Sequence, residues 1–179
     1  RKKILDANQV DCEVCPSNVD ENEVKISLIS SGANPLLISK NLAELKANKV
    51  SLKNPDRIVL GADSVIDFNG KLISKPKNRE EALNILLELN GKEHKLTSSV
   101  CISKNGSMMW NFTDTSSLTM KQLSLDEIKL YLSNVGDKEL FAYGVYQIES
   151  GGRNLFSSII GNEDSIMGLP IKQIKEYIK

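Results

Sequence analysis

Five charged residues in the first half of the sequence have the types that hydrolysis of a phosphoanhydride requires: Glu21, Lys46, Asp63, Lys75 and Glu81. Mg²⁺ binds carboxylate oxygens and substrate phosphates, and a carboxylate can also orient or deprotonate an attacking water. Lysine side chains neutralise the charge that develops on phosphate oxygens during the reaction. These residue types therefore indicate metal-assisted hydrolysis of a phosphate substrate.

Asp63 is the most informative residue of this set. It follows the apolar run 58–60, which is typical of a buried strand, and the small residues after that run predict a turn where the strand ends. Loops at strand ends often carry reacting groups because a rigid scaffold holds them in place. A structural aspartate that caps the turn is the alternative interpretation.

Other candidates also have structural interpretations. Glu81 lies three residues after Asn78, the position from which a glutamate closes a helix cap. Lys46 can be the solvated end of a helix, and Gln147 an ordinary strand residue. His94, the only histidine, is expected at the surface or behind the site rather than as a base, because nothing nearby in the sequence marks it as buried.

The composition limits the classes of function. The 179 residues suit one domain spanning 1–179, or two tightly joined lobes, and 23 basic residues balance 23 acidic ones. A balanced charge argues against binding a nucleic acid polymer but permits a single nucleotide as substrate. No segment approaches the roughly 20 apolar residues that span a bilayer, so we expect no membrane association. Three cysteines are too few for a disulfide scaffold, and we expect reduced thiols in the cytoplasm.

Familiar nucleotide and hydrolase motifs are absent. The sequence contains no Gly-x-x-x-x-Gly-Lys loop, no Gly-x-Gly-x-x-Gly after a strand and no Gly-x-Ser-x-Gly elbow. P-loop, dinucleotide-binding and serine hydrolase sites are therefore excluded. The remaining candidates are the carboxylates and lysines described above.

Apolar periodicity predicts a chain that mixes helices and strands. Helices are expected over residues 35–49 and 78–89, from Ser124 and from Pro170, and strands over residues 10–15 and 57–61. Asn69-Gly70 and Asn105-Gly106 predict two hairpins, and the glycine-rich residues 136–168 predict a loop-and-strand wall of the site. The expected fold is an α/β mixed central sheet flanked by helices.

Seven short motifs, in the same order, resemble those of the Maf family of nucleoside triphosphate pyrophosphatases along nearly the whole chain. They are Asn18-Val-Asp-Glu21, Leu42-Ala-Glu-Leu-Lys-Ala47, Gly61-Ala-Asp-Ser-Val65, Lys75-Pro76 with Glu81-Ala82, Leu89-Asn-Gly91 with His94, Tyr146-Gln-Ile-Glu149, and Gly168-Leu-Pro170. The resemblance implies two lobes with a substrate cleft between them. It also implies a cytoplasmic enzyme, commonly a homodimer, which uses a divalent metal (Mg²⁺ or Mn²⁺) to cleave nucleoside triphosphates, non-canonical or modified ones above all.

The resemblance assigns roles residue by residue. Asp63 would accept the proton of the attacking water, Glu21 and Asp63 would hold the metal, and Lys46 and Lys75 would bind the triphosphate. On the substrate-binding side it implies Arg1, Ser64, Glu81 and Gln147. Arg1 matches the arginine that ends the family's Ser-x-x-Arg motif, so we expect residues upstream of it. Ser64 and Gln147 fall where the family reads the base.

Two alternatives from other classes remain at this point. One is a nucleotide-binding regulator that has lost catalysis, which would bind a non-hydrolysable nucleotide without turnover. The other is a division-associated interaction protein whose complex with a division protein would survive loss of the Asp63 carboxylate. The balanced charge and the lack of a long apolar run argue against the second alternative.

Overall fold

A five-stranded sheet in the order β2-β1-β3-β4-β5 forms the centre of the structure, which is a computed structural model that describes residues 1–149 and 151–179. All pairs between neighbouring strands of this sheet are antiparallel. The strands are β1 (Val59–Phe68), β2 (Lys71–Ile73), β3 (Glu93–Lys104), β4 (Ser107–Met120) and β5 (Phe156–Ile160). The predicted architecture, a central sheet flanked by helices in an α/β fold, is confirmed.

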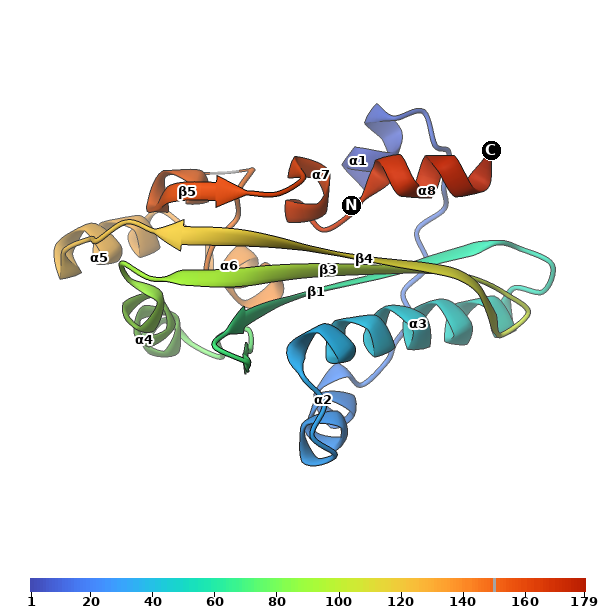
Figure 1. Cartoon of the computed structure of the whole chain (residues 1–179), viewed down its shortest axis with the longest axis horizontal. Helices are drawn as coiled ribbons and strands as arrows, with labels where there is room; N and C mark the ends of the chain where they lie inside the picture. Colours follow the sequence, from blue (N-terminus) through green and yellow to red (C-terminus); the bar gives the residue numbers. More distant parts are fainter. Residues whose placement is uncertain (150) are drawn as a thin grey trace.

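Helices cover both faces of this sheet (Figure 1). The longest, α3 (Pro35–Lys53), runs along β1 and β3 on one face with α2 (Glu21–Ser30) beside it, and α1 (Lys2–Ala7) and α8 (Ile171–Ile178) lie on the other face. Three further helices lie at the end of the sheet that is farther from α1 and α8. They are α4 (Arg79–Leu89), α5 (Leu125–Ser133) and α6 (Asp137–Tyr143). The short helices η1 (Gly152–Leu155) and α7 (Glu163–Ile166) flank β5.

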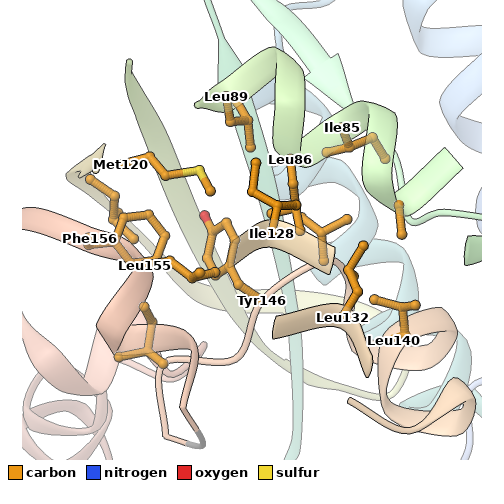
Figure 2. Close-up of a cluster of buried hydrophobic side chains, with 14 of the residues drawn as sticks. Ile85, Leu86, Leu89, Met120, Ile128, Leu132, Leu140, Tyr146, Leu155 and Phe156 are labelled. Atoms are coloured by element: carbon orange, nitrogen blue, oxygen red, sulfur yellow. The ribbon is translucent and has the colours of Figure 1, made fainter. Parts of the chain in front are cut away.

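Two apolar clusters lie at opposite ends of the long strands. The larger one packs α4, α5 and α6 against the sheet around Leu86, Ile128 and Tyr146, all of them buried (Figure 2). The smaller one packs α1 and α8 against β1 and β3, with Leu5 and Val100 at its centre. The cavity described below lies along β1 between these clusters.

Most elements lie where the sequence predicts them. Both Asn-Gly pairs form hairpin turns, with positive φ at Asn69, Gly70, Asn105 and Gly106 as a type I′ turn requires. The helices at residues 35–53, 79–89, 125–133 and 171–178 match the predicted ones. Ser124 forms the predicted capping box, because its side chain accepts from the Glu127 backbone while the Glu127 carboxylate accepts from the Ser124 backbone.

Two predictions are wrong, and one helix was missed. Residues 10–15 form no strand, because Val10 and Cys12 pack against the smaller cluster and Val14 remains 66% exposed. Helix α2 was not predicted, and Asp20 caps its first turn. Strand β1 does not end at residue 61 but continues to Phe68, so Asp63 lies inside the strand rather than in a turn.

The small residues before Asp63 have a packing role instead of a turning role. A Cβ at Gly61 would lie 2.7 Å from the Ala47 backbone nitrogen and 2.9 Å from the Ala47 Cβ. Gly61 therefore lets α3 approach β1 closely, with the buried small residues Ala43 and Cys101 in the same contact. A turn signal and a close-packing signal look alike in the sequence because both use small side chains.

Candidate active site

A cavity of about 460 Å³ lies along β1 and has a size suited to a nucleotide. Its cations come from four elements or loops: Arg1, Lys25, Lys46 and Lys75. Three carboxylates line it as well, those of Glu21, Asp63 and Glu149. The rest of the wall is largely apolar and includes Ile66, Leu96 and Ile166. A cavity with a charged part and an apolar part suits a ligand that carries phosphates and an aromatic base.

Lys46 joins two carboxylates at the centre of the charged part. Its Nζ lies 2.7 Å from Asp63 Oδ1 and 2.7 Å from Glu21 Oε1. Asp63 is only 5% exposed, and the Lys46 side chain is 14% exposed. Because the pair is largely removed from water, the ammonium group holds the Asp63 carboxylate in a defined orientation.

Helix α3 delivers Lys46 to this position. Ser39, Ala43 and Ala47 lie on the buried face of α3, and Lys46 projects from the same side towards Asp63. The Ser39 hydroxyl donates to the Asp63 carbonyl at 3.2 Å, which connects the helix to the strand at Asp63. Because Gly61 lets α3 lie close to β1, the Lys46 ammonium group can reach the Asp63 carboxylate.

The edge of β1 is open beside Asp63, because β2 pairs only with Ile66–Phe68. Successive side chains of a strand point to opposite faces, so Asp63 and Ser64 lie on different sides of that edge and both line the cavity. Arg1 lies on the Ser64 side, where its guanidinium donates to the Ala62 carbonyl, the Ser64 hydroxyl and the Gly168 carbonyl at 3.1, 3.2 and 3.0 Å. A ligand at this edge can contact groups from both faces of the sheet.

Burial and neighbouring charges together shift the pKa values of Glu21 and Lys75. Burial alone would raise the pKa of Glu21, but the hydrogen bond from Lys46 and the charges of Lys46, Lys75 and Lys25 outweigh it and lower that pKa. Burial lowers the pKa of Lys75, and the charges of Lys25 and Lys46 add to this effect while Glu21 and Asp63 oppose it. Glu21 therefore stays ionised, and Lys75 loses its proton more easily than an ordinary lysine.

Two carboxylate oxygens in the site can accept a further partner. Asp63 Oδ2 is buried without a hydrogen-bond partner among the described residues, and Glu21 Oε2 has only Lys25, at 3.7 Å. The part of the chain that the structure describes contains no group of three or more His, Cys, Asp or Glu side chains able to hold a metal by themselves. Two carboxylates, with waters and substrate phosphates completing the shell, are the ligand set typical of Mg²⁺. The residues present therefore fit a divalent cation that binds together with its substrate.

The structure brings most of the predicted site residues together. Glu21, Lys46, Asp63, Lys75, Arg1, Ser64 and Gln147 all line the cavity. Glu81 does not line it. The Glu81 carboxylate accepts from the Lys77 backbone at 2.8 Å, and its backbone donates to Asn78 Oδ1 at 2.8 Å, which forms the helix cap of the alternative interpretation.

The sequence analysis missed Lys25, which lines the cavity from α2 one helical turn after Glu21. The signal for it was the pattern Asp20-Glu-Asn-Glu23, in which Asp20 caps the helix and accepts from the backbone of Asn22 and Glu23. With that helix recognised, the spacing of four residues places Glu21 and Lys25 on one face.

His94 is buried, being 2% exposed, so the surface alternative is wrong. Its Nε2 lies 2.8 Å from the Tyr146 hydroxyl, and its ring also contacts Phe156. Burial lowers the pKa of His94 to about 4, so the ring is neutral at physiological pH. Because Tyr146 lines the cavity, His94 lies behind the cavity wall.

No helix in the described part of the chain is long and apolar enough to cross a membrane.

The family profile of the Maf-like proteins matches residues 1–179. A nucleoside triphosphate pyrophosphatase of Pelagibacter ubique is 63% identical over 179 residues, which cover 100% of this chain and 92% of that protein. A nucleoside triphosphate pyrophosphatase of a Ruegeria species is 36% identical over 178 residues, or 99% of this chain and 89% of that protein. A 7-methyl-GTP pyrophosphatase of Brucella abortus is 34% identical over 171 residues, 96% of this chain and 86% of that protein.

The match extends over all the residues that build the cavity, from Arg1 to Gly168. On this evidence, the chain belongs to the Maf-like protein family.

Proposed function

We propose that this protein is a nucleoside triphosphate pyrophosphatase that converts non-canonical or modified nucleotides to the monophosphate and pyrophosphate. The observation that carries the proposal is the buried Asp63 in a cavity rich in cations: one oxygen of its carboxylate is ion-paired, and the other has no hydrogen-bond partner among the described residues. The names of the relatives support the same reaction class.

In the proposed reaction, water attacks the α-phosphorus and the bond to the bridging oxygen of the β-phosphate breaks. Asp63 Oδ2 accepts the proton of the water, while Lys46 keeps Oδ1 oriented. Lys46, Lys75 and Arg1 offset the charge on the phosphate oxygens as pyrophosphate leaves.

Mg²⁺ or Mn²⁺ would be held by Asp63 and Glu21 and would neutralise and polarise the phosphate oxygens. Ser64, whose hydroxyl accepts from Arg1, and Gln147 would contact the base. The cytoplasmic location and the homodimer that the family resemblance implies belong to the same proposal, and sedimentation of the purified protein would measure the oligomeric state.

The test incubates the full-length protein with Mg²⁺ or Mn²⁺ and a panel of canonical and modified nucleoside triphosphates, and it measures pyrophosphate and phosphate separately. Pyrophosphate with monophosphate is the expected result, and the rates rank the bases. Phosphate with diphosphate would refute cleavage between the α- and β-phosphates. No product, with nucleotide still bound, would favour the regulator that has lost catalysis.

The variant Asp63→Asn tests the assignment of the base. An amide cannot accept the proton of the attacking water, so we expect kcat to fall by about 100-fold or more while nucleotide binding persists. Asp56→Asn is the matched control, since Asp56 also pairs with a lysine but is exposed and does not line the cavity. Unchanged turnover in Asp63→Asn would show that another group takes the proton.

A further inference from the structure

Lys25 is a cavity residue that the proposed reaction does not use. It lies on α2 one turn after Glu21, and its side chain is only 15% exposed. Lysine side chains on helices usually extend into water, since the ammonium group is strongly hydrated. A lysine whose side chain is largely covered beside a cavity therefore needs a partner for its charge.

Glu21 is the one carboxylate within ion-pair distance of Lys25 among the residues that the structure describes. The distance from Lys25 Nζ to Glu21 Oε2 is 3.7 Å, longer than a hydrogen bond, while Lys46 takes the other oxygen of Glu21 at 2.7 Å. The Glu21 carboxylate is thus shared by the ammonium groups of Lys46 and Lys25, and Lys46 is the closer of the two. The positive charge of Lys25 is incompletely compensated within the protein.

Lys75 lines the same cavity as Lys25. Burial lowers the pKa of Lys75, and the charge of Lys25 is the largest contribution from a neighbouring cation, ahead of Lys46. Lys25 and Lys75 are thus close enough to repel each other. Two ammonium groups that line one cavity, of which Lys25 is largely covered and Lys75 is exposed, attract an anion that can bridge them.

The two lysines differ from Lys46 in their relation to the proposed base. Lys46 pairs directly with Asp63, while in the described residues neither Lys25 nor Lys75 lies within ion-pair distance of that carboxylate. In the proposed reaction, water attacks the phosphorus nearest Asp63, so Lys25 and Lys75 would face phosphates farther along the chain of phosphates.

We propose that Lys25 binds the terminal phosphates of the nucleotide together with Lys75, so that the site selects triphosphates over monophosphates. The role in the reaction rests on the proposed function, but the binding of the terminal phosphates can be measured without turnover.

The experiment measures the binding of inorganic pyrophosphate and of nucleoside monophosphates by calorimetry, in the presence of Mg²⁺, for the full-length protein. Lys25→Met removes the charge and keeps much of the apolar stem, and Lys25→Arg keeps the charge. Lys104→Met is the matched control, because Lys104 also lies 3.7 Å from a carboxylate, that of Asp56, and does not line the cavity. Thermal unfolding of each variant checks that the fold is retained.

We expect Lys25→Met to weaken pyrophosphate binding about tenfold or more, the effect of losing a charged hydrogen bond, and to change monophosphate binding less than twofold. Lys25→Arg and Lys104→Met should bind pyrophosphate nearly as the parent protein does. The proposal is overturned if the parent protein binds no pyrophosphate, if Lys25→Met binds it as tightly as the parent, or if both ligands lose affinity equally. Selective loss of pyrophosphate binding without any hydrolysis by the parent would support Lys25 while refuting the proposed reaction.

Discussion

Lys46 shows how one side chain can organise a site at the scale of single residues. Its ammonium group lies 2.7 Å from a carboxylate of α2 and 2.7 Å from a carboxylate of β1. Removing one member of such a covered group leaves the remaining charges uncompensated, at a cost of about 3–5 kcal/mol for a fully buried pair. We infer that Lys46 stabilises the arrangement of Glu21 and Asp63 before any substrate binds.

The lowered pKa of Lys75 leads to a prediction about pH. A lysine that binds phosphate only when protonated loses that binding as pH rises through its pKa, so kcat/KM should fall on the alkaline side below the pH expected for an ordinary lysine. Lys75→Arg, which stays protonated, should move this fall to higher pH in the pH profile of kcat/KM. Lys71→Arg is the control at an exposed ion pair, and an unmoved profile in Lys75→Arg would exclude a role of Lys75 in binding.

The decisive contact between elements is the approach of α3 to β1. Gly61 and Ala47 meet where any larger side chain would hold the two apart, and Ser39 bonds the same helix to the strand at Asp63. The distance between α3 and β1 thus determines whether Lys46 reaches Asp63.

Gly61→Ala tests this contact. The added Cβ would lie 2.7 Å from the Ala47 backbone nitrogen, so α3 must move away from the strand. We expect the free energy of unfolding in urea to fall by about 1–3 kcal/mol and kcat to fall with it, since Lys46 moves with the helix. Parent-like stability and kcat would show that α3 can shift without disturbing the site.

At the scale of the whole molecule, the larger apolar cluster and the cavity share a wall. Tyr146 is buried in this cluster and packs edge-on against Phe156 (Figure 2). It also contacts His94 and lines the cavity. The folding of the core and the shape of the cavity are therefore coupled through these aromatic side chains.

The burial of His94 in this shared wall predicts how the free energy of unfolding depends on pH. The folded protein binds a proton at His94 with a pKa of about 4, while the unfolded chain does so at the ordinary 6.5, so the unfolded state takes up more protons between these values. The free energy of unfolding should therefore fall by up to about 3 kcal/mol as pH drops from 6.5 to 4, on the basis of 1.36 kcal/mol per pKa unit.

Urea unfolding of the parent protein and of His94→Gln at several pH values measures this effect. Because His94 is the only histidine, the substitution should flatten the dependence between pH 6.5 and 4 whatever it does to stability at pH 8. An equally steep dependence in His94→Gln would assign the acid sensitivity to carboxylates instead.

The sequence by itself determined the features that depend on neighbouring residues. The Asn-Gly turns, the Ser124 capping box and the helices over residues 35–53 and 79–89 each follow from contacts within a few positions along the chain. The motifs also identified Glu21, Lys46, Asp63 and Lys75, all of which line the cavity.

Only the tertiary structure decided how those residues are placed. Asp63 lies inside a strand at an open sheet edge, His94 is buried, Glu81 caps a helix away from the cavity, and Lys25 joins the charged part of the site. Each of these outcomes depends on residues far apart in the chain, such as Ala47 against Gly61 or His94 against Tyr146. Burial and distance between such residues arise from packing, which no local pattern of residue types encodes.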